Sequence, residues 1–238
     1  MDYTNIKGVI FDYGGTIDSR GDHWSEIIWD GYKLNNIAIT KEQFREAYVY
    51  AERELARVKH IFPEDDFYKL LLVKMHLELG CLAEKGLIEG VNVEQLAVKI
   101  ATYCNQQAIN SVEQARPVIE QLSKLFPLVL VSNFYGNVEA VLKAYDLRRY
   151  FQTIVESAVV GVRKPDPAIF QLGVDALSLD ANEVLVIGDS YKKDIVPARS
   201  IGCQVMWLKG KGWSADEDAQ IDTSIIKSLN QVLQLIRI

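Results

Sequence analysis

Residues Val9 to Thr16 read VIFDYGGT, an apolar run that leads directly into a carboxylate and a pair of glycines. The apolar run predicts a buried strand, and Gly14 and Gly15 predict a sharp turn immediately after it. Asp12 therefore falls at the carboxyl end of the strand. A carboxylate in that position is well placed to act as a nucleophile or as a metal ligand.

Further strand-like runs appear from Gln114 onward, and they alternate with helical segments. These runs span Leu128 to Ser132, Thr153 to Ser157, Val184 to Gly188 and Gln204 to Leu208. Strands that alternate with helices predict a parallel sheet with helices on both faces, so we expect an α/β fold with a Rossmann-like core. In such folds ligands bind at the carboxyl ends of the strands.

The pattern between about Trp24 and Asn110 is different, because apolar residues there recur with a helical period. Thr40 and Gln43 have the spacing of a capping box, and apolar residues then fall on one helical face as far as Val58. This part of the chain predicts an all-helical unit inserted between the first strand and the later ones.

The change of pattern predicts two domains. We expect a core domain made of residues 1–19 and 111–238, and an all-helical domain made of residues 20–110. At the end of the chain, the segment from Asp222 to Leu235 predicts a capped amphipathic helix that seals the core.

Polar side chains stand at the ends of the later runs or in the loops between them. Ser132 and Asn133 end one run, and Asp189 and Asp194 lie in the sequence GDSYKKD that follows another. Lys164 lies in GVRKPDP, directly before an apolar helix start.

Together with VIFDYGGT, these segments resemble the four motifs of the haloacid dehalogenase-like (HAD) superfamily, in the same order along the chain. The resemblance implies a phosphoryl hydrolase that acts on a small phosphorylated metabolite. It implies that Asp12 attacks phosphorus and forms an aspartyl-phosphate, that Ser132 donates a hydrogen bond to a phosphoryl oxygen, and that Lys164 pairs with the phosphate and the nucleophile. The helical domain then corresponds to the family's cap, which closes over the nucleophile and carries substrate-reading groups.

The resemblance also implies a Mg²⁺ cofactor. Its expected ligands are Asp12, Asp189 and the main-chain carbonyl of Gly14, with Asp194 as a further ligand or in indirect support. The same resemblance implies substrate contacts at three further residues, namely Gly15, Thr16 and Asn133. Thr16 is also expected to tighten the turn that presents the nucleophile.

Gly14 departs from the family pattern, which has a second Asp at this position as general acid and base. One hypothesis is a leaving group that needs no proton, as in acyl phosphates, or in a phosphonatase-like reaction that uses a lysine of the cap. The lysines available there are Lys33, Lys59, Lys69 and Lys74. A 2-haloacid dehalogenase-like reaction needs no metal, which is at odds with the presence of Asp189 and Asp194.

A second hypothesis is that a different side chain near the nucleophile supplies the proton. The candidates in the sequence are Tyr13, Asp18, Asp22, His23 and Glu26. His23 has the most suitable ordinary pKa among them. A third hypothesis is that the protein hydrolyses its ligand weakly and binds a phosphorylated metabolite for sensing or for control of a partner.

The composition excludes several classes of function. With 238 residues and a net charge of −6, the chain has no basic footprint for a nucleic acid. No signal sequence or membrane-spanning run is visible, so we expect a cytoplasmic protein. We also expect a monomer or a homodimer. The three cysteines, Cys81, Cys104 and Cys203, lack the spacing of a metal site and are expected to be buried thiols.

Overall fold

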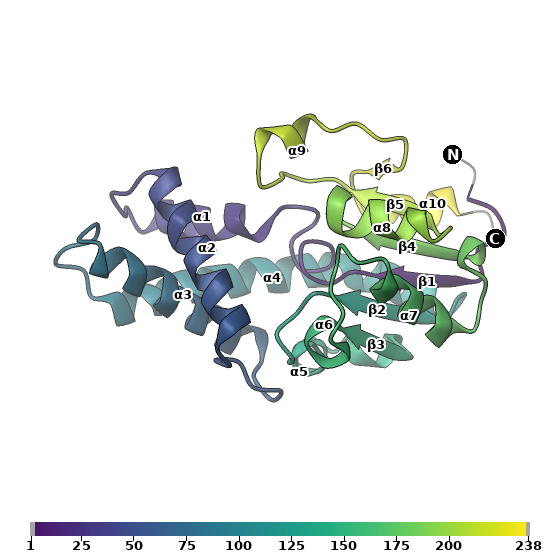
Figure 1. Ribbon diagram of the computed structural model, residues 1–238, viewed down its shortest axis with the longest axis horizontal. Coiled ribbons are helices and arrows are strands. Elements are labelled where there is room, and N and C mark those ends of the chain that lie inside the picture. The colour runs from purple at the N-terminus through teal and green to yellow at the C-terminus, as the bar shows by residue number, and fades with distance from the viewer. Residues whose placement is uncertain (1–2, 237–238) are drawn as a thin grey trace.

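The computed structural model describes residues 3–236, in which a parallel six-stranded sheet has the strand order β3-β2-β1-β4-β5-β6 (Figure 1). The strands are β1 (Gly8–Phe11), β2 (Leu128–Ser132), β3 (Thr153–Glu156), β4 (Val184–Gly188), β5 (Gln204–Leu208) and β6 (Ile225–Ile226). All neighbouring strands pair in parallel. The predicted α/β class is therefore confirmed, and each predicted run is a strand, β3 ending one residue earlier than expected.

Helices cover both faces of the sheet and also form a separate bundle at one end of the molecule (Figure 1). They are α1 (Trp24–Leu34), α2 (Lys41–Arg57), α3 (Phe67–Glu84), α4 (Val93–Ser123), α5 (Val138–Ala144), α6 (Ser157–Val160), α7 (Ala168–Leu177), α8 (Val196–Ser200), α9 (Ala215–Ala219) and α10 (Asn230–Leu235). Short 3₁₀-helices occur at Arg148–Tyr150 and Ala181–Glu183, and a short π-helix occurs at Tyr191–Ile195. No helix within residues 3–236 has the length and apolar character needed to cross a membrane.

β1 is the strand that fixes the position of the first motif. It lies between β2 and β4, with Ile10 opposite Val129 on one side and Val186 on the other. Its residues alternate between the two faces, so Phe11 packs in the core that includes α4, whereas Ile10 packs in the core that includes α7. A strand buried on both faces cannot shift its register without moving apolar side chains into new surroundings, which holds the following turn in place.

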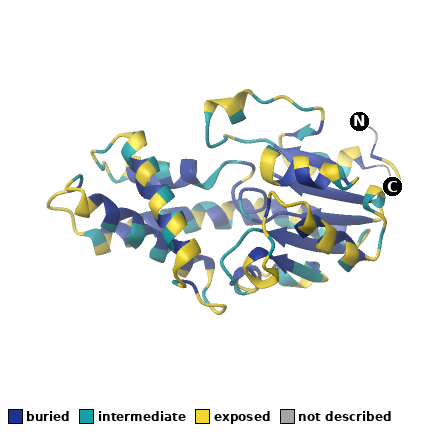
Figure 2. Ribbon diagram, viewed as in Figure 1, coloured by how far each residue is buried: buried dark blue, intermediate teal, exposed yellow. Residues whose placement is uncertain are grey.

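The helical bundle consists of α1, α2 and α3 together with the first part of α4. α2 begins with the predicted capping box, in which Thr40 and Gln43 bond reciprocally. Its apolar residues Phe44, Ala51 and Leu55 are buried, and Figure 2 shows buried, intermediate and exposed residues alternating along the bundle helices. This periodicity explains why the bundle could be predicted from the sequence.

The longest helix, α4, connects the bundle to the sheet. It runs as one helix across residue 110, where we predicted a domain boundary, so the chain has no flexible linker at that point. Val112 and Ile119 of α4 share a buried cluster with Leu130 of β2. The division into a core and a helical domain remains a prediction, and the ends of the predicted core ranges, residues 1–2 and 237–238, lie outside the described residues.

The end of the chain differs from its prediction. We expected one helix from Asp222 to Leu235, but Ile225–Ile226 is strand β6, which pairs with Trp207 and Leu208 of β5. Only Asn230–Leu235 is helical. The edge of β5 offers unpaired backbone groups to this apolar segment, and pairing with it outweighs the helical pattern.

Candidate active site

The predicted motifs meet at the carboxyl ends of β1, β2 and β4. Asp12 directly follows β1, and its N–H donates to the carbonyl of Ile187 in β4 at 2.9 Å. Ser132 ends β2, and Asp189 directly follows β4. Adjacent parallel strands bring their carboxyl ends to one edge of a sheet, so residues far apart in the sequence become neighbours there.

Lys164 joins two of the acids. Its Nζ lies 2.6 Å from Oδ1 of Asp12 and 2.6 Å from Oδ1 of Asp194. All three side chains are at most 6% exposed. Burial opposes the charge of Lys164, but the two carboxylates raise its pKa above the usual value, so the ammonium stays charged. Burial raises the pKa of Asp12, and Lys164 opposes that rise.

The third acid, Asp189, has no ion-pair partner among the described residues. Its pKa lies well above the ordinary value because the carboxyl is buried and because Asp194 and Asp12 lie nearby. One oxygen from each of the three acids lies within 4.8 Å of the others. Three carboxylates at one site with a single lysine leave negative charge uncompensated, and a set of hard oxygen donors is what Mg²⁺ takes. The residues present therefore fit a Mg²⁺ ion.

Thr16 and Gly15 fix the geometry of the turn after β1. The Thr16 hydroxyl lies 3.0 Å from Oδ2 of Asp12 and 3.3 Å from Oδ1 of Asp189, so its proton can serve either carboxylate. Gly15 has a φ of +96°, and a Cβ there would lie 2.3 Å from the Asp189 carboxyl group. Only glycine allows the backbone to pass so close to Asp189.

Gly14 stands in different surroundings. A Cβ added at Gly14 would meet no atom of the described residues within 4 Å. The absence of a side chain here is therefore not required by packing. It leaves open space in the cavity wall at the position where the resemblance implies an acid.

Ser132 and Asn133 at the end of β2 differ in what they contact. The Ser132 hydroxyl is buried and has no hydrogen-bond partner among residues 3–236. A buried hydroxyl without a partner is unfavourable unless a ligand supplies one. The amide of Asn133, by contrast, bonds the backbone of Lys164 twice, donating to its carbonyl at 3.1 Å and accepting from its N–H at 2.9 Å. The sequence did not indicate this positioning role, and the substrate contact expected at Asn133 stays a prediction.

A cavity of about 900 Å³ lies over these groups. Asp12, Lys164 and Asp189 line one side of it. The other sides are formed by helices α1 to α3 and by the loop that follows β5, which includes Trp213. The site is thus shared between the sheet edge and the helical bundle.

Two of the candidate replacement acids line this cavity. Asp18 is buried, accepts the N–H of Gly15 at 2.7 Å and has its pKa raised to about 8, mainly by burial. His23 caps α1 through Nδ1, which accepts the N–H of Ser25. Burial, together with Lys193 and Lys74, lowers the pKa of His23 to about 4. The imidazole is therefore neutral at pH 7, and its pKa lies below the range that made His23 the most suitable candidate in the sequence.

The remaining three candidates do not line the cavity. Glu26 pairs with Lys41 at 2.5 Å and with Lys211 at 2.7 Å, and these pairs lower its pKa against the effect of burial. Asp22 accepts the N–H of Lys211. Tyr13 is buried, and burial raises the pKa of its hydroxyl well above the usual value.

Among the four bundle lysines that could serve a phosphonatase-like reaction, Lys74 is the one that lines the cavity. It pairs with Glu52, and this pairing raises its pKa despite complete burial. An amine that forms a Schiff base must lose its proton, so these surroundings oppose that reaction. The structure thus favours a charged Lys74.

A sequence profile of haloacid dehalogenase-like hydrolases matches residues 6–202. The chain belongs to the haloacid dehalogenase-like hydrolases. Among solved structures, the HAD-hydrolase YfnB from Bacillus subtilis, determined bound to magnesium, shares the fold with a TM-score of 0.63. The two sequences are 20% identical, and the comparison covers 98% of this chain and 99% of that one.

Curated relatives match shorter stretches of this HAD-like hydrolase. Haloacid dehalogenase-like hydrolase domain-containing protein 3 of Danio rerio is 38% identical over 82 residues, which are 34% of each chain. Glyceraldehyde 3-phosphate phosphatase of Pyrococcus abyssi is 30% identical over 104 residues, 42% of this chain and 43% of that protein. The matched stretches therefore span 34% and 43% of these relatives, less than half of each.

Proposed function

We propose that this HAD-like hydrolase is a Mg²⁺-dependent phosphatase that acts on a small phosphorylated metabolite through an aspartyl-phosphate on Asp12. One observation carries the proposal: the buried ammonium of Lys164 bonds Oδ1 of Asp12 at the floor of a cavity, beside two further carboxylates. The similarity to glyceraldehyde 3-phosphate phosphatase of Pyrococcus abyssi supports a phosphatase rather than a dehalogenase.

Asp12 is held in the orientation that an attack on phosphorus needs. Lys164 bonds one carboxylate oxygen and Thr16 lies within hydrogen-bond distance of the other, so the side chain cannot rotate freely. A fixed nucleophile lowers the activation free energy, because the entropy of orienting the carboxylate is already lost when the protein folds. Asp12 donates an electron pair to phosphorus, and the bond to the leaving oxygen breaks with its electron pair going to that oxygen. Water then attacks phosphorus in the aspartyl-phosphate, which releases phosphate and restores the carboxylate of Asp12.

The phosphoryl group would be held by the chain's own donors. The Ser132 hydroxyl, which lacks a partner among residues 3–236, donates to one phosphoryl oxygen. Lys164 stabilises the negative charge that develops on the group during transfer. Asn133 acts indirectly, because its side-chain amide holds the backbone of Lys164 in place through two hydrogen bonds.

The metal would be held by Asp12, Asp189 and Asp194, together with the main-chain carbonyl of Gly14. When bound, Mg²⁺ supplies positive charge against the phosphoryl oxygens. The ligand at Gly14 is a backbone group, so the lack of a side chain does not remove it. The three carboxylates provide the donor set that this role requires.

Residues 20–110 would serve as a cap over the nucleophile. Side chains of α1, α2 and α3 line the cavity opposite Asp12, which supports this assignment. A cap excludes water from the transfer step and contacts the part of the substrate beyond the phosphate. The domain boundaries expected from the sequence, at residues 19/20 and 110/111, define the proposed cap.

Gly14 sets the kind of leaving group that the enzyme handles best. Without a carboxylate at this position, an alkoxide must leave without a proton from it, and a general acid is typically worth ~10²–10⁴ in rate. Acyl phosphates, whose leaving group is a stable carboxylate, avoid the part of this loss that concerns the leaving group, whereas the attack of water on the aspartyl-phosphate is the same for every substrate. We therefore expect acyl phosphates to be hydrolysed readily and ordinary alkyl phosphates only modestly.

The same residue favours a second function, binding of a phosphorylated metabolite without efficient hydrolysis. Phosphate release from acetyl phosphate and from a panel of sugar phosphates, measured with Mg²⁺ and with EDTA, distinguishes the two. Metal-dependent release supports the phosphatase. No release from any compound, combined with metal-dependent binding of orthovanadate, would favour the binding protein.

A further inference from the structure

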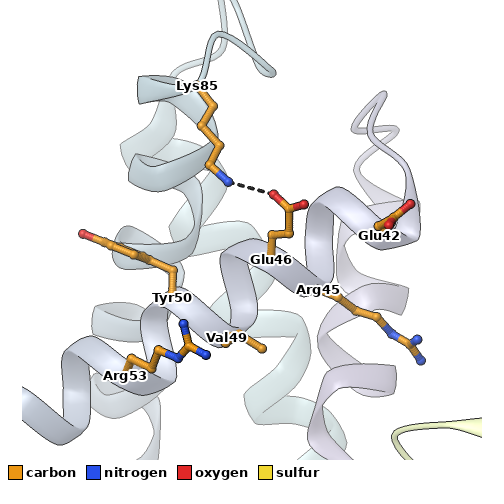
Figure 3. A pocket seen from close by; sticks show the side chains of 7 residues that line it. All are labelled: Glu42, Arg45, Glu46, Val49, Tyr50, Arg53 and Lys85. Atoms are coloured by element: carbon orange, nitrogen blue, oxygen red, sulfur yellow. Dashed lines mark hydrogen bonds and ion pairs between the residues drawn. The ribbon is translucent and has the colours of Figure 1, made fainter.

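Two Lys–Glu pairs join helices α2 and α3, and they lie in contrasting surroundings. On the outer surface, Lys85 reaches Glu46 at 2.8 Å across an open depression, and both side chains are exposed (Figure 3). On the inner side, Lys74 pairs with Glu52 in the wall of the cavity. The outer pair is an ordinary solvated contact that contributes little to stability.

The inner pair is much more deeply buried. The side chain of Lys74 is 5% exposed, and its ammonium lies 4.0 Å from the ring centroid of Tyr48. Burying a charged pair costs hydration free energy that the attraction between the charges often fails to recover. The outer pair shows that α2 and α3 can be joined without this cost, so joining the helices does not explain the position of Lys74.

The inner pair is also tied to the sheet. Tyr135, from the loop after β2, lies 3.0 Å and 3.1 Å from the two carboxylate oxygens of Glu52 and donates its proton to one of them. This contact links a bundle helix to the loop that begins at Asn133, directly after Ser132 at the end of β2. Glu52 and Lys74 are therefore held at a fixed position opposite the phosphoryl site, on the same cavity.

The cavity around this pair is lined by aromatic rings. Phe67 and Phe134 lie on one side, with centroids 6.5 Å apart and planes at 23°. Tyr48 and Trp213 lie on another, with centroids 5.4 Å apart. Arg45 holds Trp213 in place by donating to its carbonyl at 2.5 Å. Aromatic walls favour flat apolar faces, whereas the ion pair offers hydrogen-bond donors and an acceptor.

Building on the proposed phosphatase function, we infer that Lys74 and Glu52 recognise the alcohol part of the substrate, and that this part carries a flat ring with hydrogen-bond donors and acceptors, as in a nucleoside or flavin monophosphate. Size agrees with this inference, since a cavity of about 900 Å³ far exceeds what a three-carbon phosphate fills. The charges agree as well, because the opposite charges of the pair suit a ring system without net charge.

The test compares ring-bearing with small substrates. Values of kcat/KM are measured with Mg²⁺ for riboflavin 5′-phosphate, GMP, glycerol 3-phosphate and acetyl phosphate. We expect both ring-bearing compounds to exceed glycerol 3-phosphate by at least ~10-fold, which is the effect of one well-made hydrogen bond to a charged group. Equal or higher values for glycerol 3-phosphate, with acetyl phosphate hydrolysed, would overturn the inference while leaving the phosphatase intact.

The variant K74M/E52Q tests the two residues. Because it removes both charges together, it leaves no unpaired buried charge that would destabilise the fold. Its ratio of kcat/KM for riboflavin 5′-phosphate to that for acetyl phosphate should fall by at least ~10-fold. The variant K85M removes the outer lysine from the same two helices and should leave the ratio at the wild-type value. A ratio that stays unchanged in K74M/E52Q, in protein that melts like the wild type, would overturn the assignment.

A binding measurement separates this inference from the proposed function. Quenching of riboflavin 5′-phosphate fluorescence is titrated with Mg²⁺ present, in proteins that also carry Asp12→Asn, so that the ligand binds without turnover. Micromolar binding that weakens at least ~10-fold in K74M/E52Q supports the inference even if no compound is hydrolysed. No detectable binding by the protein with Asp12→Asn alone, or binding that the variant leaves unchanged, contradicts it.

Discussion

The ammonium of Lys164 lies 2.6 Å from Oδ1 of Asp12, although the two residues are 152 positions apart in the chain. This contact compensates the charge of the proposed nucleophile and limits its rotation at the same time. The lysine also bonds Asp194 at 2.6 Å, so one buried cation serves two of the three carboxylates that line the site.

The first prediction concerns the nucleophile. Asp12→Asn should abolish phosphate release, because an amide has no electron pair suited to attack phosphorus. The fold should persist, since asparagine has nearly the same shape and Lys164 keeps its bond to Asp194. Circular dichroism checks the fold and malachite-green detection of phosphate checks turnover. Turnover at the wild-type rate would remove covalent catalysis from the mechanism.

Gly14 offers a gain-of-function test. Gly14→Asp should increase the hydrolysis of alkyl phosphates by at least ~10-fold if proton transfer limits the rate. Space is available, because a Cβ at this position meets no described atom within 4 Å. The matched control is Gly14→Asn, which has similar size but no acid. Equal rates in both variants would show that another group already supplies the proton.

Gly15 should tolerate no side chain, in contrast to its neighbour. Gly15→Ala places a Cβ 2.3 Å from the Asp189 carboxyl group at a φ of +96°, so we expect a loss of stability of about 1–3 kcal/mol. Gly14→Ala should change the free energy of unfolding by less than about 1 kcal/mol, because the space there is open. Urea unfolding measures both. Similar losses at the two positions would contradict the geometry of the turn.

Removal of the buried lysine should destabilise the protein in a way that depends on pH. Lys164→Met leaves the buried carboxylates of Asp12 and Asp194 without their cation, which should cost about 3–5 kcal/mol at pH 8 in the absence of metal. The loss should shrink at pH 5, because burial raises the pKa values of Asp12 and Asp189 and their protonation relieves the repulsion. Thermal unfolding at both pH values checks this, and added Mg²⁺ should recover part of the loss at pH 8. An equal loss at pH 5 and pH 8 would argue against charge as the cause.

A second pH effect should come from Glu78 inside the bundle. Burial raises the pKa of its carboxyl to about 8, with Lys74 nearby lowering it, and Tyr32 donates to one oxygen at 3.2 Å. The pKa of this carboxyl is higher in the folded protein than in the unfolded chain. Its contribution to the free energy of unfolding is therefore fully present below about pH 4.5 and is lost as the pH rises towards 8.

Glu78→Gln should therefore be more stable than the wild type at pH 8 by about 1–3 kcal/mol, with a smaller difference at pH 5. The amide preserves the size of the side chain and an acceptor for Tyr32. Urea unfolding of both proteins across this pH range measures the difference. A constant difference across the range would mean that the carboxyl of Glu78 does not titrate as the structure predicts.

The sequence alone determined five of the six strands and the residues that end them. Runs such as Leu128 to Ser132 are apolar and short, and a strand buried on both faces requires that pattern. The capping box at Thr40 is similarly local, because its partners lie three residues apart. The approximate edge position of Asp12 and Asp189 followed from these local signals.

Only the tertiary structure decided which side chains meet. The pairing of Lys74 with Glu52 depends on how two helices pack, and Tyr135 joins it from another part of the chain. Strand β6 formed where a helix was expected, because the edge of β5 was available for pairing. Helical and strand periods act over a few neighbouring residues, whereas cavities, buried charges and sheet edges arise from segments that the folded chain brings together.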